Sequence, residues 1–249
     1  MSVKIANLLK LDARWYVVIA IVLMALLAVR TEGVIVLGHT ISICLTACIL
    51  DFIIISLRDK RVAFPLSALV SGLIISVVLA PIRHFYIYIV PIAAILSKHI
   101  IKYRHKHVFN PAGFGLLVAD IFSSGLPHFW GLAHTWTGLA AEWTLTVIFG
   151  LFLAYKIKKF SLILSFILTT FILCIIHRSY PCIPAPPFFV FFMLPEPKTS
   201  PLHLIGKCLY GVIVAVAAMI SFVLFPRHDF LILGLMVGNI FGVFLRKAR

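Results

Sequence analysis

The chain has 249 residues, of which 62% are hydrophobic and only 12% are charged, and its mean hydropathy is +1.12. A soluble domain averages about 45–50% apolar and about 25% charged residues, so this composition excludes a soluble protein and predicts an integral membrane protein. The net charge of +14 does not indicate a nucleic-acid partner, because the basic residues stand in short clusters between apolar runs. Such clusters favour contact with the anionic headgroups of a lipid bilayer.

Ten apolar segments follow one another along the chain. They cover residues 15–29, 33–57, 63–80, 84–97, 109–122, 139–155, 160–176, 186–194, 203–225 and 229–245. We expect the first to be a retained helix and not a cleaved signal, because it is long and lacks an A-x-A site. A helix needs about 20 apolar residues to cross a bilayer core of about 30 Å. The segments 109–122 and 186–194 are shorter, which predicts short or broken helices that line a cavity.

The positions of Lys and Arg predict the orientation of these segments. With ten crossings and a cytoplasmic N-terminus, the outer loops hold only four of the 22 Lys and Arg residues, namely Arg30, Arg83, Arg178 and Arg227. Leaving out the short segment 186–194 would place the basic C-terminus outside, so the charge rule supports counting it. We therefore predict an all-α polytopic protein of about ten transmembrane segments, in the cell membrane, with both termini cytoplasmic.

An internal match indicates a repeat. Ten crossings divide into two groups of five, and an odd number in each group inverts the second group relative to the first. The sequence GLLVADIF at Gly115–Phe122 matches GLMVGNIF at Gly234–Phe241 at five of eight positions, and it pairs Asp120 with Asn239. We predict one membrane domain over residues 1–249 that consists of two inverted five-helix repeats, at about 12–122 and 139–245.

Several polar residues within or beside the apolar segments are candidates for function. A charge at membrane depth costs about 2.5–3.5 kcal/mol on insertion scales, so Asp120 and Glu142, with Asn239, are candidates for a polar or transport path. The alternative places both carboxylates at the headgroup boundary. His134 lies in the aromatic loop between them and is a candidate for a redox or proton path, although the loop tryptophans are also typical of an interfacial belt.

The remaining histidines and the cysteines suggest structural roles. We expect His39 to be a satisfied core residue, and His99, His105 and His107 to be solvated within the basic stretch 98–107. The five cysteines are expected to pack as small apolar residues, because no CxxC pair supports an iron–sulfur or metal site.

The basic stretch ends at a helix-start signal, Phe109-Asn110-Pro111. Proline suits the first helical position, and Asn110 is expected to cap the free backbone N–H groups. Gly113 permits close approach of a helix or a ligand. The positive helix end suits a phosphate or a carboxylate, and a capped short helix without a ligand is the alternative. In the other short segment, the prolines around Glu196 and Thr199 exclude a continuous helix.

Two motifs resemble a known family of membrane subunits, which belong to the sodium-pumping NADH:quinone oxidoreductase (NqrB) and to the Rnf electron-transport complex (RnfD). The first is Phe109-Asn110-Pro111-Ala112 after a basic stretch. The second is Phe191-Phe192-Met193, followed by an acidic-Pro-x-Thr-x-Pro pattern from Glu196 to Pro201. Ser67, Ser71 and Gly72 in the third segment and Asn239 in the last are also similar.

The resemblance implies a ten-helix inverted-repeat fold similar to that of urea transporters, with flavin cofactors. On this basis the cofactor-binding candidates are Asn110, Pro111, Gly113, His134, Glu196 and Thr199, and no metal ligand is predicted. The family attaches FMN to the last threonine of a Ser/Thr-Gly-Ala-Thr motif after the fifth helix. Here Ser124-Gly125 and Thr137-Gly138 are each followed by other residues, so we expect non-covalent FMN or riboflavin and no covalent FMN.

These observations predict a membrane subunit of a flavin-dependent electron-transport system of the Rnf or NADH:quinone oxidoreductase type. Some family members couple electron transport to cation movement. The expected partners are the lipid bilayer and other membrane electron-transport subunits, and as an enzyme the chain would be at most an oxidoreductase subunit. The alternatives are a channel or transporter of a small solute or ion on the same fold, and an assembly subunit without a cofactor.

Overall fold

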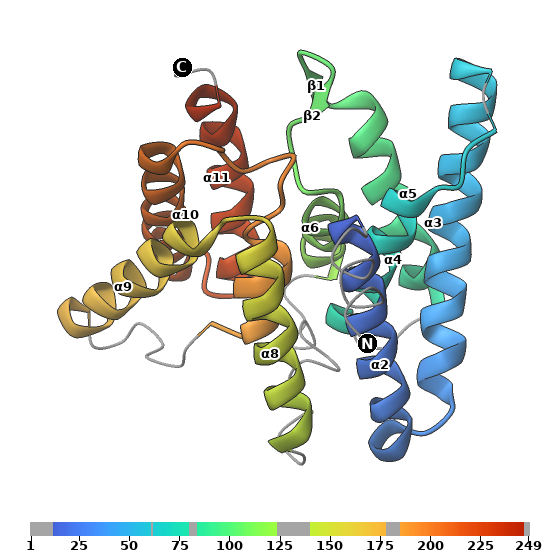
Figure 1. Cartoon of the computed structure of the whole chain (residues 1–249), viewed down its shortest axis with the longest axis horizontal. Coiled ribbons are helices and arrows are strands. Elements are labelled where there is room, and N and C mark those ends of the chain that lie inside the picture. The colour runs from blue at the N-terminus through green and yellow to red at the C-terminus, as the bar shows by residue number, and fades with distance from the viewer. Residues whose placement is uncertain (1–11, 61, 80–83, 124–139, 178–184, 247–249) are drawn as a thin grey trace, which may run out of the picture.

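The structure is a computed structural model that describes residues 12–60, 62–79, 84–123, 140–177 and 185–246. Each of the ten predicted apolar segments contains a helix within these ranges (Figure 1). The helices are α2 (Ala13–Glu32), α3 (Ile35–Asp59), α4 (Leu66–Val78), α5 (His84–Ile100), α6 (Pro111–Ser123), α8 (Ala140–Lys156), α9 (Phe160–Ile176), the π-helical turn η2 (Phe189–Met193), α10 (Leu204–Leu224) and α11 (Phe230–Leu245).

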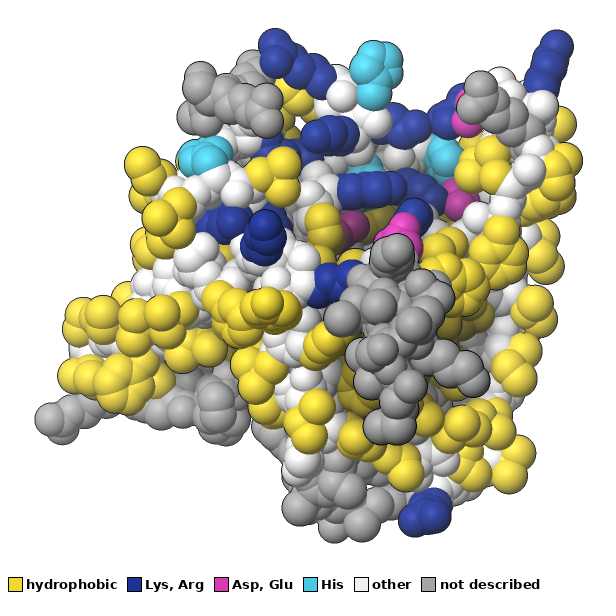
Figure 2. Space-filling view, viewed as in Figure 1, with side chains coloured by type: hydrophobic (Ala, Val, Ile, Leu, Met, Phe, Trp, Pro, Cys, Tyr) yellow, Lys and Arg dark blue, Asp and Glu magenta, His cyan; other side chains and the backbone are white. Residues whose placement is uncertain are grey.

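The helices have the length and the surface of a membrane protein. Three described helical stretches are long and apolar enough to cross a bilayer, namely Ala13–Arg30, Ile35–Asp59 and Leu204–Leu224, and six shorter helices are also apolar. Hydrophobic side chains cover the flanks of the face shown in Figure 2, while Lys and Arg gather toward its upper part. An apolar surface of this extent is unfavourable in water and favourable in lipid. The chain is therefore an α-helical membrane protein.

The helices pack as two neighbouring groups around one hydrophobic core. In the first group α3 packs on α4 and α5, and α5 packs on α6; in the second α10 packs on α9 and α11. The groups meet where α2 contacts α8 and where α6 contacts α11 (Figure 1). Buried residues of both groups, such as Ile75, Leu116 and Leu235, belong to the same core cluster.

Two glycines permit the closest helix contacts near the α6–α11 pair. A Cβ atom on Gly115 of α6 would lie 2.5 Å from the backbone oxygen of Val90 in α5. A Cβ atom on Gly234 of α11 would lie 2.8 Å from the backbone oxygen of Val214 in α10. Small residues at such positions let helix backbones approach closely, which is the main way helices associate in lipid.

The basic stretch folds as a small hairpin between α5 and α6. Strands β1 (Lys102–Tyr103) and β2 (Lys106–His107) pair antiparallel. Arg104 and His105 occupy the turn with positive φ angles of 47° and 66°, as the tight turns that connect twisted strands require. Because side chains alternate along a strand, Lys106 is exposed and His107 points inward and is buried. The hairpin thereby carries a histidine toward the start of α6.

The segment after η2 is not helical, as its prolines predict. The chain leaves η2 at Leu194 and turns through residues 195–201 before α10 begins. Backbone N–H groups of Thr199 and Ser200 donate to the carbonyl oxygen of Glu196 within this turn, at 3.3 and 3.0 Å. The segment therefore reverses direction over one short turn, which we call the 195–201 turn.

Candidate functional site

Asn110 joins the start of α6 to the end of η2, 83 residues away in the sequence. Its Oδ1 accepts a hydrogen bond from the backbone N–H of Gly113 at 3.2 Å, and its Nδ2 donates to the backbone oxygen of Met193 at 3.1 Å. Pro111 follows as the first residue of α6, so the predicted cap is confirmed. The amide also satisfies a carbonyl of the π-helical turn, where the hydrogen-bond ladder of a normal helix is interrupted.

Glu196 makes a second link between the same two segments. Its Oε1 lies 3.2 Å from Nε2 of His107, and its Oε2 accepts a hydrogen bond from Oγ1 of Thr199 at 3.1 Å. His107 and Thr199 are both buried, and Glu196 is partly exposed toward the basic face of the molecule. The hairpin, the start of α6 and the 195–201 turn therefore form one polar junction, which contains Asn110, Glu196 and Thr199 among the predicted residues.

Lys159 holds the 195–201 turn from its other side. This lysine precedes α9, and its side chain is almost fully buried, with 1% relative exposure. Its Nζ donates to Oγ of Ser200 at 2.9 Å and also to the backbone oxygen of Pro201. Burial, together with the nearby positive charges of Lys207 and Arg246, lowers the pKa of Lys159 to about 8.

Asn239 lies in α11 close to the junction and bonds to a buried tyrosine. The hydroxyl of Tyr210 donates to Asn239 Oδ1 at 2.7 Å, and both side chains are fully buried. A Cβ atom on Gly242, one turn further along α11, would lie 2.7 Å from the backbone oxygen of Thr199, so α11 packs directly on the 195–201 turn. Within the described part of the chain, Nδ2 of Asn239 has no hydrogen-bond partner.

Asp120 lies at the opposite end of the α6–α11 pair. Its Oδ2 is 3.0 Å from Nδ1 of His228 and accepts a 3.3 Å hydrogen bond from the backbone N–H of Asp229. Asp229 in turn caps α11 by accepting from the N–H groups of Leu231 and Ile232. Asp120 is completely buried in protein, and the structure therefore does not place it at an exposed headgroup boundary. The carboxylate faces the positive end of α11, which stabilises its charge.

A further buried ion cluster joins α3 and α5. The carboxylate of Asp51 lies 2.8 Å from Nζ of Lys98 and 2.6 Å from Nε2 of His99. The Asp51 side chain is 1% exposed, Lys98 is 11% exposed and His99 is 8% exposed. Arg58 extends the cluster toward the surface, with its Nη1 3.4 Å from Nδ1 of His99. Paired charges of this kind are what a buried carboxylate requires.

The structure corrects one expectation for the basic stretch and confirms another. His99 and His107 are not solvated: both are buried and each contacts a carboxylate, because a helix end and a strand turn them inward. His105 is exposed, as predicted. His39 is the expected core histidine, with Nε2 3.0 Å from the backbone oxygen of Leu79. Cys44 is buried, as expected for a packing residue.

Two predicted site residues cannot be placed. His134 lies outside the described residues, and the side chain of Glu142, in the first turn of α8, is also outside them. The structure adds four residues that the sequence did not single out as site candidates, namely Asp51, Lys159, Tyr210 and His228. Asp51 was visible as a lone charge inside an apolar segment, and a search for a basic partner in another segment would have found Lys98. The other three carry no comparable signal.

The predicted cofactor residues form a packed junction and do not line a flavin-sized slot. Asn110 and Thr199 are buried and bonded within the junction, and a Cβ atom on Gly113 would lie 2.8 Å from the Met236 side chain. A cavity of about 280 Å³ adjoins the 195–201 turn and is lined by Lys106, Pro197, Ser200, Leu202, His203 and Arg246. Its basic lining suits an anionic group better than an apolar ring system. No group of three His, Cys, Asp or Glu side chains in the described ranges is arranged to hold a metal ion.

Comparison with known proteins adds no family. No protein-family model matches the chain, and no curated protein matches it at a significant level.

Replacing Asn110 tests how the junction is held. Asn110→Ala should lower the free energy of unfolding by about 2 kcal/mol, since it removes a helix cap and leaves the buried Met193 carbonyl without its donor. Asn110→Asp retains the capping oxygen and loses the donor, so it should retain part of this stability. Unfolding of the detergent-solubilised protein by heat or denaturant measures both. Equal, negligible losses in the two variants would contradict the proposed link.

Proposed function

We propose that this chain is the membrane subunit of a flavin-dependent electron-transport system similar to Rnf and the sodium-pumping NADH:quinone oxidoreductase. The observation that carries the proposal is the contact between the two motifs of the family resemblance. The FNPA motif and the FFM…E-P-x-T motif are far apart in the sequence, yet Asn110 bonds to Met193 and His107 lies against Glu196. Motifs that are joined in space are better explained by one shared structural role than by chance.

We further propose that the chain consists of two inverted five-helix repeats. When the match between GLLVADIF and GLMVGNIF is continued toward the N-terminus, it pairs Asn110 with Asp229. Each of these residues caps its helix: Asn110 accepts from the N–H of Gly113 at 3.2 Å, and Asp229 accepts from the N–H of Ile232 at 2.9 Å. Gly113 and Ile232 are themselves paired by the same alignment. The two helix starts therefore share a capping arrangement as well as a sequence pattern.

The helices that precede α6 and α11 support the same repeat. Ile89–Ser97 of α5, IVPIAAILS, and Ile213–Ser221 of α10, IVAVAAMIS, are identical at five of nine positions. The matching Val and Ala of each helix are the residues that meet Gly115 and Gly234. In a two-fold arrangement, equivalent helices of the two halves meet at the axis, and α2 with α8 and α6 with α11 are such pairs. Ten membrane segments with both termini at the basic, cytoplasmic face are the topology that this repeat requires.

The cofactor would be non-covalent FMN or riboflavin, which would supply the electron-transfer chemistry when bound. The junction around Asn110 and Thr199 is closed and would support the fold near such a cofactor without forming the wall of its site. Other membrane subunits of the electron-transport system are the proposed partners. The exposed apolar side chains of α9, including Ile167 and Phe171, offer them a surface within the membrane.

A spectrum of the purified protein tests the flavin. The protein, extracted in mild detergent, should absorb between about 350 and 500 nm, as an oxidised flavin does, and denaturation should release a fluorescent, protein-free chromophore. Flavin that stays attached after denaturation would contradict non-covalent binding. A colourless preparation, obtained also when the protein is purified with its native membrane partners, would contradict the flavin proposal.

A channel or transporter without redox chemistry is the second candidate, and the ionisable groups along α6 and α11 favour it. Glu196 and His107 lie at one end of this helix pair, and Asp120 and His228 lie at the other. Intramembrane ionisable residues often mark ion or proton pathways. A colourless protein that moves a cation or a small solute in liposomes, and that loses this activity in Asp120→Asn, would establish the second candidate instead. A colourless protein without flux would indicate a cofactor-free assembly subunit.

A further inference from the structure

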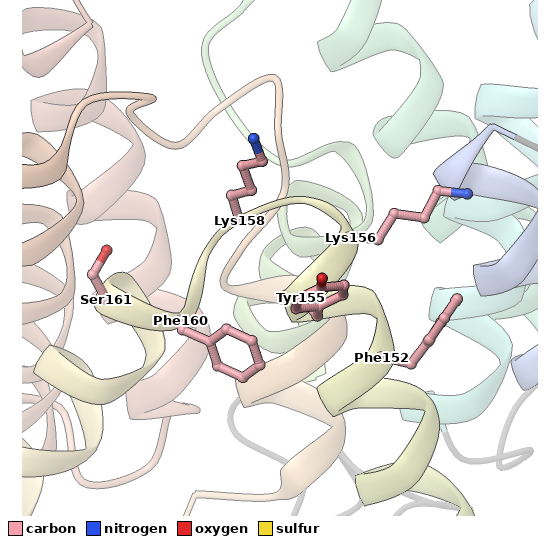
Figure 3. Close-up of a pocket in the computed structure, with 6 residues that line it drawn as sticks. All are labelled: Phe152, Tyr155, Lys156, Lys158, Phe160 and Ser161. Carbon is pink, nitrogen blue, oxygen red and sulfur yellow. The ribbon is translucent and has the colours of Figure 1, made fainter. Parts of the chain in front are cut away.

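A cavity of about 540 Å³ lies where α8 ends and α9 begins. It is lined by Phe152, Tyr155, Lys156, Lys158, Phe160 and Ser161 (Figure 3). Three of these six residues are aromatic and two are lysines. The cavity is separate from the polar junction, and neither the family resemblance nor the proposed electron transport uses these residues.

The cavity results from the way the chain turns between the two helices. Lys158 adopts a left-handed conformation, with φ of 55°, and the N–H of Lys159 bonds back to the carbonyl of Ala154, which ends α8. The buried side chain of Lys159 then fixes the turn to Ser200. From this point α9 packs along α10 and runs away from α8, so the two helices form an open angle (Figure 1).

The walls of this angle are apolar and face outward. Tyr155 is 73% exposed and Phe160 is 44% exposed at the cavity itself. Leu151 on α8 and Leu164 and Ile167 on α9 continue the exposed apolar surface away from the turn. In a membrane protein such a surface faces acyl chains, and aromatic rings near its end are typical of the level of the lipid headgroups.

The end of the cavity nearest the turn is positively charged. Lys156 and Lys158 lie at its rim, and their side chains extend toward the basic face of the molecule (Figure 3). Lys207 adds a third ammonium group, since its Nζ donates to the carbonyl of Lys158 at 2.8 Å. Among the residues that the structure describes, no acidic side chain lines the cavity or lies in the first turn of α9. A basic end above apolar walls complements an anionic headgroup above its acyl chains.

We propose that this cavity binds one anionic phospholipid. The phosphate lies at the lysine end, near Lys156, Lys158 and the hydroxyl of Ser161. An acyl chain passes Tyr155 and Phe160 and continues along the open angle between α8 and α9. The lipid fills space that protein side chains leave open, and it connects the α8 end of the molecule to the α9–α10 pair. The proposal does not depend on the flavin.

Lipid binding to the delipidated, detergent-solubilised protein tests this site by native mass spectrometry. Phosphatidylglycerol should bind more tightly than phosphatidylcholine with the same acyl chains. The variant Lys156→Gln/Lys158→Gln should weaken phosphatidylglycerol binding about 30-fold, because each basic residue near an anionic lipid contributes about 1 kcal/mol. The control Lys60→Gln/Lys102→Gln removes the same charge from exposed positions at the basic face and should bind as the wild type does.

Two further measurements distinguish a bound lipid from a bound phosphate group alone. Glycerol phosphate, which carries the phosphate ester without acyl chains, should not compete with phosphatidylglycerol, and Phe160→Ala should weaken phosphatidylglycerol binding. Because Lys156 also lies 3.9 Å from the Tyr16 ring centroid, Lys158→Gln alone tests the phosphate contact with that interaction intact. Equal binding of the two lipids, an equal loss in the control variant, or effective competition by glycerol phosphate would overturn the proposal.

Discussion

Asp51→Asn is expected to destabilise the protein by about 3–5 kcal/mol, because it would leave a buried lysine without its counter-charge. Lys98 Nζ contacts both carboxylate oxygens of Asp51, at 2.9 and 2.8 Å, and its side chain is only 11% exposed. The asparagine side chain preserves the shape and removes the charge, so the loss reflects electrostatics and not a cavity. Unfolding of the detergent-solubilised protein measures the change.

The same helix offers a matched control. Asp59 pairs with Arg58 at 2.7 Å, but both side chains are more than 40% exposed, and water screens such pairs. Asp59→Asn should therefore change stability little. The double variant Asp51→Asn/Lys98→Gln removes both charges and should be less destabilised than the sum of its single variants. A small effect of Asp51→Asn, similar to that of Asp59→Asn, would show that the cluster is not a buried ion pair.

Gly115→Ala is expected to lower the free energy of unfolding by about 3 kcal/mol through overpacking. The added Cβ would lie 2.5 Å from the backbone oxygen of Val90 and 3.0 Å from the Cβ of Ala94. Backbone atoms cannot move aside as a flexible side chain does, so α5 and α6 must separate. This change would also disturb the start of α6 and its bond to Met193. The yield of folded protein and its thermal unfolding measure the effect.

Gly38→Ala is the matched control, because it makes the same change within a helix. No atom of the described residues lies within 4 Å of a Cβ added at Gly38. Alanine is favoured over glycine in helices by about 1 kcal/mol, so this variant should be as stable as the wild type or slightly more stable. If the two variants behave alike, the close α5–α6 contact does not stabilise the protein.

The sequence predicted the helices well because their main cause is local. All ten apolar segments correspond to helices, and the predicted cap at Asn110 is present, as is the interruption by prolines around Glu196. In lipid a backbone must satisfy its own hydrogen bonds, so an apolar run is strongly constrained to be helical. Helix starts and stops depend on neighbouring residues, and these can be read from the sequence.

The partners of the polar residues could not be predicted in the same way. His99 and His107 belong to a basic stretch that looks solvated, yet a helix end turns one toward Asp51 and a strand turns the other toward Glu196. Asp120 was expected in a polar path or at the headgroup boundary, and its contact with His228 depends on α11 packing beside α6. Such contacts join residues up to 108 positions apart, and no local pattern specifies them.

By itself, therefore, the sequence determined that this is an α-helical membrane protein, where its helices lie, and where two of them are short. It also indicated the two motifs that carry the family resemblance. Only the tertiary structure decided that these motifs meet at one junction, that Asp51 is paired and buried, and that α8 and α9 diverge to form a cavity. The physical reason is that helix formation follows from neighbouring residues in an apolar solvent, whereas charge pairing and cavities depend on how separate helices pack.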